Sequence, residues 1–205
     1  MSRERLIDLL SAQIGDRRVL AAIAAVPRDL FVPPSLRSEA WDNISLPIGH
    51  GQTISQPSVV ARMCELLELD GSETVPDVGT GSGYHAAVLA RLAARVVSIE
   101  LEAALSRRAR EALDEAGAEN VTLIVGDASH GHPELAPYDA INVAAASERG
   151  VPRALTDQLA AGGRLVAPVD GGSQRLTVVR RRDGGLEQEW YERVRFVPLV
   201  TRDRD

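Results

Sequence analysis

The chain contains no lysine, a single cysteine and no long hydrophobic run, and these absences exclude several kinds of protein. All 23 basic residues are arginines, which we interpret as a compositional habit of the source rather than a functional device. The single Cys64 rules out an internal disulfide and fits a reducing cytoplasm. The first residues lack an apolar signal core, and no apolar run approaches membrane-spanning length. We therefore expect a soluble, cytoplasmic protein.

Charge and histidine content exclude further classes of function. The net charge of −6 and the pI near 5.3 argue against general binding to nucleic acid or to membranes. Four scattered histidines and one cysteine make no metal site, and no Ser-His-Asp set is visible. The 205 residues are most economically a single domain. Within it, residues 1–48 are expected to form a helical N-terminal cap and lead-in, and residues 49–205 the cofactor- and substrate-binding core.

Hydrophobic periodicity predicts helices that alternate with strands and a hairpin at the C-terminal end. This order indicates an α/β fold with a doubly wound sheet and an antiparallel edge. In the last strand, Leu186, Trp190, Val194 and Phe196 are expected to share one apolar face. The predicted helices cover 3–13, 16–25, 58–69, 84–92, 102–116 and 152–160, and the predicted strands 74–75, 96–99, 121–125, 138–143, 164–169, 174–182 and 186–197.

The most informative stretch is Asp77-Val-Gly-Thr-Gly-Ser-Gly83, expected between a strand and a helix. Its three glycines let the backbone approach a nucleotide-like ligand, and the helix start offers unpaired N–H groups. Glu100 ends the next strand, where its carboxylate can accept hydrogen bonds from both ribose hydroxyls. Asp127 ends the third strand and is well placed to receive an adenine amino group. The complete dinucleotide fingerprint is missing because its sixth position is Tyr84, which favours S-adenosylmethionine over NAD.

A second distinctive segment, Gly49-His-Gly-Gln-Thr-Ile-Ser-Gln-Pro57, precedes an amphipathic helix. Pro57 suits a first helical turn, and Ser55 or Gln56 is near the capping position. One interpretation is simply a well-capped helix start. The other is an anion site, in which hydroxyls and free amides face a carboxylate. His50 is a lone loop histidine and is expected to be solvated.

With these residues, the sequence resembles the protein-L-isoaspartate (D-aspartate) O-methyltransferase family from about Val26 to Leu199. The glycine loop alone would suggest any class I methyltransferase, whereas Gly51-Gln-Thr-Ile-Ser-Gln-Pro57 is far more specific. The pieces that carry the resemblance are Val26-Pro-Arg-Asp-Leu-Phe-Val-Pro33, Leu46-Pro-Ile-Gly-His-Gly-Gln-Thr-Ile-Ser-Gln-Pro57, Gly79-Thr-Gly-Ser-Gly-Tyr84, Ala136-Pro-Tyr-Asp139, Gln158-Leu-Ala-Ala-Gly-Gly-Arg164 and Arg195-Phe-Val-Pro-Leu199.

The resemblance implies a class I, Rossmann-like methyltransferase fold that uses S-adenosyl-L-methionine and releases S-adenosyl-L-homocysteine. The substrate would be the free carboxylate of an isoaspartyl residue in a damaged protein or peptide, and its methyl ester would collapse to a succinimide. Ser55 would be the polar residue nearest the transferring methyl and would orient the carboxylate. We expect a monomer without metal. The implied substrate residues are Thr53, Ile54, Ser55 and Gln56, and the implied cofactor residues are Asp77, Gly79, Thr80, Gly81, Ser82, Gly83, Glu100, Asp127 and Ala128.

Four features depart from the family pattern. The strand into the glycine loop reads Val75-Pro-Asp77 instead of Val-Leu-Glu, although a proline in a central strand removes a ladder hydrogen bond. Gly126-Asp-Ala128 replaces Gly-Asp-Gly, which puts a methyl group beside the adenine. Asn142 stands in a strand that is normally apolar, and the segment 144–152 is one residue longer than usual.

Three functions are compatible with these motifs. The first is repair of isoaspartyl residues in many proteins. The second is a peptide-tailoring methyltransferase that drives aspartimide formation in one precursor peptide, although no obvious peptide-binding domain follows residue 200. The third is a catalytically inactive, cofactor-binding interaction protein. Retention of Ser55, the three glycines, Glu100 and Asp127 weighs against this third function.

Overall fold

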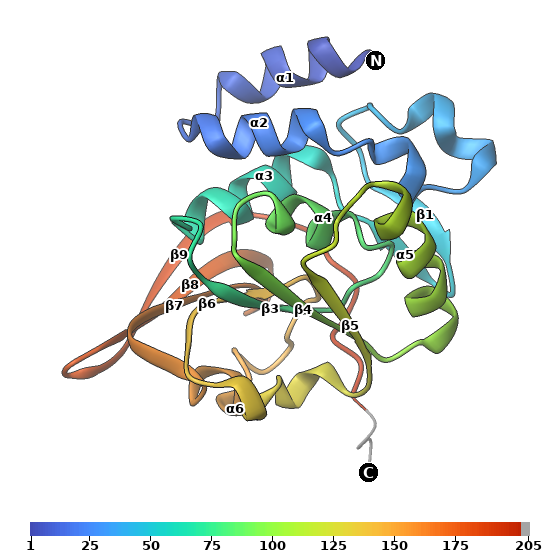
Figure 1. Ribbon diagram of the computed structural model, residues 1–205. Coiled ribbons are helices and arrows are strands. Elements are labelled where there is room, and N and C mark those ends of the chain that lie inside the picture. The colour runs from blue at the N-terminus through green and yellow to red at the C-terminus, as the bar shows by residue number, and fades with distance from the viewer. Residues whose placement is uncertain (202–205) are drawn as a thin grey trace.

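A seven-stranded sheet runs through the computed structural model, which describes residues 1–201 (Figure 1). Its strands follow the order β5-β4-β3-β6-β7-β8-β9. Strands β3 to β7 are parallel, and β8 and β9 are added antiparallel at one edge. The predicted sheet with an antiparallel C-terminal hairpin is confirmed. The bounds are β3 (Thr74–Val78), β4 (Arg95–Glu100), β5 (Val121–Val125), β6 (Tyr138–Val143), β7 (Leu159–Asp170), β8 (Gln174–Arg182) and β9 (Gly185–Arg193).

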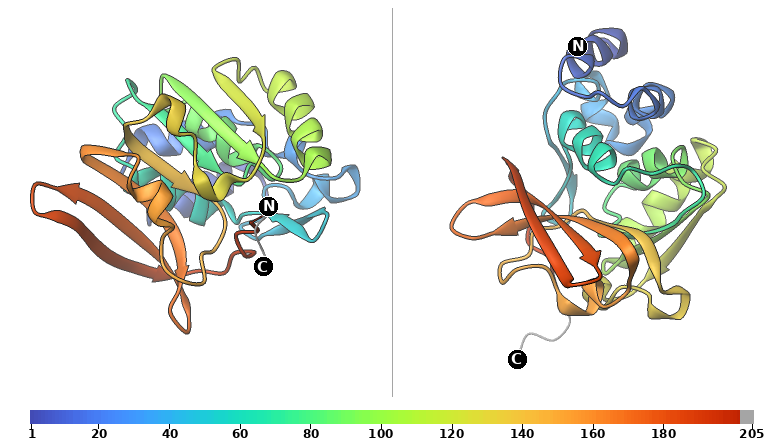
Figure 2. Two further views of the ribbon diagram at one scale, coloured as in Figure 1. Left: turned by 90° about the horizontal axis from the view of Figure 1, so that it is seen from below. Right: turned by 90° about the vertical axis from the view of Figure 1, so that its left-hand side faces the viewer.

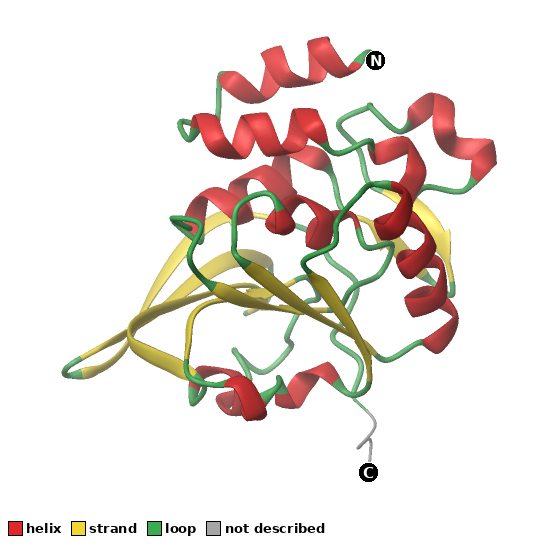
Figure 3. Ribbon diagram, in the orientation of Figure 1, coloured by secondary structure: helices red, strands yellow, loops and turns green. Residues whose placement is uncertain are grey.

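Helices cover the two faces of the sheet unequally. The helices are α1 (Arg3–Ser11), α2 (Arg17–Ala25), α3 (Pro57–Leu66), α4 (Tyr84–Ala90), α5 (Ala103–Glu115) and α6 (Arg153–Thr156). Short 3-10 turns are η1 (Arg28–Phe31), η2 (Pro34–Glu39), η3 (Ala128–His130) and η4 (Pro133–Leu135). In Figures 1 and 3, α3, α4 and α5 lie on one face with α1 and α2 stacked beyond them, and α6 lies on the other. None of the helices within residues 1–201 has the length and apolar character of a membrane span.

The sheet separates two hydrophobic cores because successive side chains of a strand point to opposite faces. In β3, Val75 packs into the core shared with α1 to α5, whereas Val78 packs into the core on the side of α6. Ala140 and Ile141 of β6 divide in the same way. Since buried side chains of α1 and α2 belong to the first of these cores, the N-terminal helices are part of the main body.

The proline in the central strand affects pairing on one side only. The N–H of Gly79 donates to Ile99 O, so the odd-numbered residues of β3 direct their N–H groups towards β4. The nitrogen of Pro76 therefore faces β6, and pairing with β6 begins only at Asp77, opposite Asn142. Pairing with β4 is uninterrupted along the whole of β3. The cost expected from the sequence therefore falls on the β6 side, where Pro76 has no N–H to donate, and the ladder with β4 stays intact.

The helix predicted at 152–160 is wrong in extent, because α6 is a short helix and β7 already begins at Leu159. The N–H of Tyr138 donates to Gln158 O at 2.8 Å, which ties this stretch to β6. Tyr138 pairs with Leu159 and Ala140 pairs with Arg164, so two residues of β6 run beside five residues of β7. The extra residues of β7 form a bulge. A Cβ atom on Gly163 would lie 2.8 Å from Tyr138 O. This glycine therefore permits the close approach of the two strands.

The C-terminal hairpin extends away from the body of the molecule (Figure 2). The apolar face predicted for 186–197 is therefore only partly buried. Phe196 is 9% exposed, whereas Leu186 and Trp190 are 48% and 47% exposed. β9 is an edge strand, and residues 1–201 bury neither of these two side chains. β9 ends at Arg193, earlier than predicted.

A two-stranded hairpin, absent from the predicted strands, precedes α3. β1 (Leu46–Gly49) pairs antiparallel with β2 (Gln52–Ile54). The turn between them contains His50 and Gly51, with φ angles of 52° and 70°. The hairpin spans residue 48, so the expected N-terminal cap and the expected core share it.

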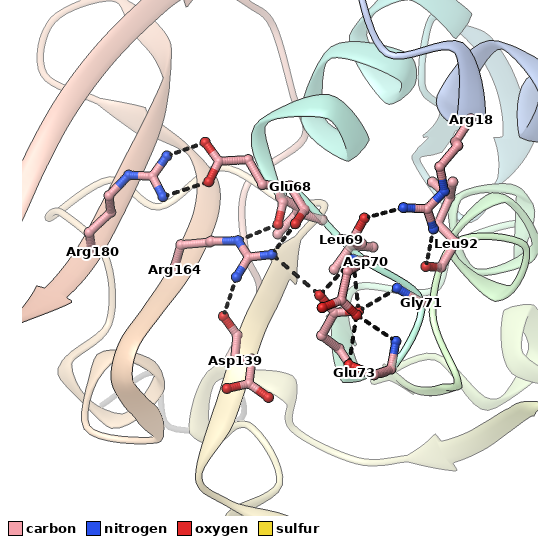
Figure 4. Close-up of polar contacts among 12 residues, drawn as sticks. Arg18, Glu68, Leu69, Asp70, Gly71, Glu73, Leu92, Asp139, Arg164 and Arg180 are labelled. Carbon is pink, nitrogen blue, oxygen red and sulfur yellow. Dashed lines mark hydrogen bonds and ion pairs between the residues drawn. The ribbon is translucent and has the colours of Figure 1, made fainter.

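Paired charges close the amino end of the sheet (Figure 4). Arg164 of β7 donates to backbone carbonyls at the end of α3 and lies 3.4 Å from the buried carboxylate of Glu73. That carboxylate also accepts two backbone N–H groups of the preceding turn at 2.9 and 3.0 Å. Arg180 of β8 binds both carboxylate oxygens of Glu68 at 2.6 and 3.0 Å. These contacts tie the last turn of α3 to the edge of the sheet.

Candidate active site

At the opposite end, the carboxyl ends of β3 to β6 meet at one edge, and a first pocket opens there. Four of the residues predicted to bind the cofactor line it. These are Gly79, Gly81, Glu100 and Ala128. The other lining residues are His50, Gln52, Thr53, Ile99, Leu101, Glu102, Ala144, Ala145 and the segment 197–200.

The glycine loop, residues 77–83, needs its glycines for two different reasons. Gly79, Gly81 and Gly83 all have positive φ angles, of 92°, 55° and 89°, which other residues rarely adopt. Gly79 and Gly81 line the first pocket, where bare backbone leaves room for a ligand. Gly83 instead faces α5, since its Cβ would lie 3.2 Å from that of Ala109. The third glycine therefore serves packing, and the first two shape the pocket.

Glu100 joins the glycine loop to the end of β4. One of its carboxylate oxygens accepts the N–H of Gly81 at 2.8 Å, and the other accepts the N–H of Glu102 at 2.9 Å. The side chain also lines the first pocket. Because an ionised carboxylate offers about four acceptor sites, it can still receive ribose hydroxyls. The predicted ribose contact is therefore sterically and chemically feasible.

The end of β5 contributes less directly than the sequence suggested. Ala128 is buried and lines the first pocket. Asp127 does not line it, and its carboxylate accepts the N–H of Ser129 at 2.9 Å at the start of η3. Ser82 accepts the N–H of Tyr84 at 3.3 Å. Contacts of Asp127 and Ser82 with the cofactor stay predictions.

Asp77 lies beneath the glycine loop and outside the first pocket. Its fully buried carboxylate accepts hydrogen bonds from Ser98 Oγ and Asn142 Nδ2, both at 2.7 Å. Ser98 uses its only proton on Asp77, so Thr80 must donate the 2.6 Å bond to Ser98. Burial raises the pKa of Asp77 to about 6, against the two hydrogen bonds. Asp77 thus has no exposed surface for direct contact and supports the loop through Ser98 and Thr80.

Asn142 continues this polar chain into the protein. Its amide nitrogen must face Asp77, because a carbonyl oxygen there would be repelled by the carboxylate. The same nitrogen lies 3.2 Å from Nδ1 of His85, which therefore accepts, and Nε2 carries the proton towards Cys64 Sγ at 3.5 Å. Burial lowers the pKa of His85 to about 3 and raises the pKa of the Cys64 thiol, so both are neutral. Two departures from the family pattern, Asp77 and Asn142, are thus direct partners.

A second pocket lies beside the first and contains most of the predicted substrate residues. Thr53, Ser55 and Gln56 line it, together with two arginines near the end of the hairpin. Its remaining lining residues are Ser45, Val59, Ala144, Val194, Phe196 and Val197, and the arginines are Arg193 and Arg195. Sequence reasoning did not single out these arginines, although Arg195 begins one of the motifs that carried the resemblance.

The side chain of Ser55 does not cap the following helix. Gln56 occupies the capping position of α3 and makes no side-chain hydrogen bond there. Asn43 supplies the cap from outside, since its Oδ1 accepts the N–H of Ser58 at 3.0 Å. The helix-cap interpretation of Ser55 is therefore wrong, and the anion-site interpretation stays a prediction.

The substrate segment and the glycine loop face each other across a narrow gap. Thr53, Ile54 and Ser55 line one side of this gap, and residues 79–82 line the other. Thr53, Ala144 and Val197 line both the first and the second pocket. A ligand in one pocket can therefore approach a ligand in the other across a wall of small side chains.

Arg28 supports the substrate segment from beneath, and sequence reasoning missed its role. Its guanidinium is fully buried and lies 5.0 Å from the centroid of the Tyr84 ring. Burial lowers the pKa of Arg28 to about 10, so the group stays charged at neutral pH. It donates to the carbonyl oxygens of Ala40 at 2.7 Å, Ile44 at 3.0 Å and Ser55 at 3.1 Å. The available signal was the arginine of the Val26–Pro33 motif.

Comparison with known families decides between the possible class I methyltransferases. The family model described as Protein-L-isoaspartate(D-aspartate) O-methyltransferase (PCMT) matches residues 1–204. The chain belongs to this family. The protein-L-isoaspartate O-methyltransferase of Halorhodospira halophila is 56% identical over 97% of this chain and 91% of its own length. That of Methanoregula boonei is 52% identical over 97% of this chain and 92% of its own length.

Solved structures agree on the fold. A protein-L-isoaspartate O-methyltransferase superposes with a TM-score of 0.86 and 30% identity, covering 96% of this chain but 65% of that longer one. A Plasmodium falciparum protein described under the same family name, in complex with S-adenosyl-L-homocysteine, gives a TM-score of 0.83 and 25% identity. It is matched over 98% of this chain and 99% of its own. The predicted family and class I methyltransferase fold are confirmed.

Proposed function

We propose that this protein transfers the methyl group of S-adenosyl-L-methionine to the free carboxylate of L-isoaspartyl residues in damaged proteins and peptides. The observation that carries this proposal is the pair of adjoining pockets, one beside Glu100 and one beside Ser55, in a member of this family. The methyl ester then collapses to a succinimide, and hydrolysis of the succinimide returns some normal aspartate. The function is thus protein repair.

The residues of the first pocket fit the cofactor. S-adenosyl-L-methionine supplies a methyl group on a positively charged sulfur. Gly79 and Gly81 have no side chains, which leaves room for the cofactor against the backbone. Glu100 offers carboxylate oxygens to the ribose, and Ala128 provides an apolar wall for the adenine. We assign Asp127 to the adenine amino group, and Asp77 to supporting the loop.

The residues of the second pocket orient the acceptor. A carboxylate with a pKa of about 4 is ionised at neutral pH, so no general base is needed. Ser55 donates one hydrogen bond to the substrate carboxylate. Thr53, Ile54 and Gln56 line the way from the second pocket to the residues that both pockets share. Alignment of a carboxylate oxygen with the methyl carbon can supply roughly 7–11 kcal/mol. Arg28 keeps Ser55 in place through its carbonyl oxygen.

A labelled methyl-transfer assay tests this function. An isoaspartyl peptide and its aspartyl twin are incubated with the protein and methyl-labelled cofactor. We expect label on the isoaspartyl peptide alone, as a base-labile ester that releases methanol. Equal rates on the two peptides, or label on nitrogen, would refute the proposal.

We further infer that the protein acts as a monomer in the cytoplasm. The free, buried Cys64 suits a reducing compartment. Sedimentation equilibrium at micromolar concentration tests the first point, and cell fractionation tests the second.

A further inference from the structure

The second pocket contains two exposed arginines that a single isoaspartyl carboxylate does not require. Arg193 is the last residue of β9, and Arg195 follows two residues later. Both line the pocket with Ser55. Neither forms a salt bridge with any residue from 1 to 201. Their charges are therefore available to a ligand.

The surroundings do not explain these charges as a device for stability. No acidic side chain lines the second pocket, and the neighbouring Glu192 is engaged by Arg62 at 3.1 Å. Arg193 pairs across the strands with Arg175, and like charges opposite each other weaken a strand pair. In a chain of net charge −6, positive charge is thus concentrated at one rim of the candidate active site.

The backbone that carries the arginines is held in place. Gln174 makes two hydrogen bonds to the backbone of Phe196. Its Oε1 accepts the N–H of Phe196 at 2.6 Å, and its Nε2 donates to the carbonyl oxygen of Phe196 at 3.2 Å. The next residue, Val197, accepts the N–H of Ala146 at 2.8 Å. A charged pair on fixed backbone can discriminate between ligands, because little ordering is needed on binding.

We propose that Arg193 and Arg195 form a subsite for a second carboxylate, so that the enzyme favours isoaspartyl peptides with an adjacent Asp or Glu. This inference rests on the proposed function. The pocket has a volume of about 330 Å³, which is within the usual range for ligand sites and leaves room for a neighbouring side chain. Arginine suits this task because its planar guanidinium matches a carboxylate with two parallel hydrogen bonds.

Matched peptides provide the test. Three isoaspartyl peptides differ only in having Glu, Gln or Lys next to the isoaspartyl residue, on either side. At low salt, we expect kcat/KM for the Glu peptide to exceed that for the Gln peptide about three- to tenfold, as two exposed ion pairs allow. The Lys peptide should be the poorest. In the double variant Arg193→Gln, Arg195→Gln, the Glu and Gln peptides should become equal, and 1 M salt should have the same effect on the wild type.

Arg182→Gln is the control, because Arg182 lies on the same hairpin but outside the pocket and pairs with Glu187. It should keep the preference for the Glu peptide. Equal kcat/KM for the Glu and Gln peptides in the wild type, or an equal loss of preference in Arg182→Gln, would overturn the subsite. Failure to methylate any of the three peptides would instead overturn the proposed function.

Discussion

The two ends of the sheet use the same kinds of charged residue in opposite ways. At the amino end, Arg164 meets Glu73 and Arg180 meets Glu68, so each charge is neutralised within the fold. At the carboxyl end, Glu100 faces one pocket, and two arginines face the other. Removing one partner of a buried pair destabilises the fold, whereas charges left facing a pocket can bind a ligand. Substitutions at the first end should change stability, and those at the second should change binding or turnover.

The largest effect is expected for Arg164→Ala at the amino end. Glu73 is 5% exposed and would keep a buried charge without its cationic partner, so unfolding free energy should fall by about 3–5 kcal/mol. Urea unfolding measures this loss. Turnover per folded molecule should be retained. The control Arg182→Ala breaks an exposed pair and should cost at most about 1 kcal/mol. Equal losses in the two variants would contradict the comparison.

Asp77 links the two behaviours, because it is a buried charge under the carboxyl-end pocket. Its folded pKa of about 6 is above the unfolded value of 3.8, so the protonated group stabilises the fold below pH 4 and this contribution is lost as pH rises through 6. Asparagine does not ionise, so the stability of Asp77→Asn should not fall in this way as pH rises. Relative to wild type, the variant should gain stability between pH 4 and 7, by up to about 3 kcal/mol.

Denaturant unfolding at several pH values checks this. The exposed carboxylate in Asp114→Asn is the control, and its stability difference from wild type should change little with pH. A constant difference between Asp77→Asn and wild type would show that the folded pKa of Asp77 is not raised.

Glu100→Ala tests the acidic side of the carboxyl end. The affinity for S-adenosyl-L-homocysteine should weaken by about 1.5–3 kcal/mol, the range for hydrogen bonds to a charged group. Glu100→Gln keeps one acceptor oxygen, so its affinity should lie between those of the wild type and Glu100→Ala. Titration calorimetry measures the affinities. Glu102→Ala, in the same pocket, should have a smaller effect, and an unchanged affinity in Glu100→Ala would dismiss the ribose contact.

Ser55→Ala tests the other side of the shared wall. Loss of one charge-assisted hydrogen bond costs about 1.5–3 kcal/mol, which slows methyl transfer roughly ten- to a hundredfold. Cofactor affinity and melting temperature should be unchanged, because Asn43 supplies the helix cap. Ser45→Ala, in the same pocket, is the control and should lose less. Full activity in Ser55→Ala would remove this serine from the mechanism, and complete loss would point to a nucleophile.

Much of the pocket for the cofactor was predictable because its signals are local. Glycines at 79 and 81 permit the positive φ angles found there, and Glu100 falls at a strand end that periodicity alone located. The closing hairpin was predictable for the same reason, since Asp183 and Gly184 are typical turn residues between two predicted strands. The helix at 152–160 failed because strand pairing with Tyr138 outweighed the local helix signal.

What the sequence by itself determined is the family, the order of the elements and the identity of the loops that meet at the site. Only the tertiary structure decided which polar groups meet inside it. Asp77 was expected to touch the cofactor, yet it is paired with Asn142, 65 residues away. Ser55 was expected near the cap of α3, but Asn43 accepts the capping N–H. Arg28 instead binds the carbonyl oxygen of Ser55. A buried donor or acceptor bonds to whichever partner the fold brings within about 3 Å. The number of residues between two groups along the chain does not predict whether they come that close.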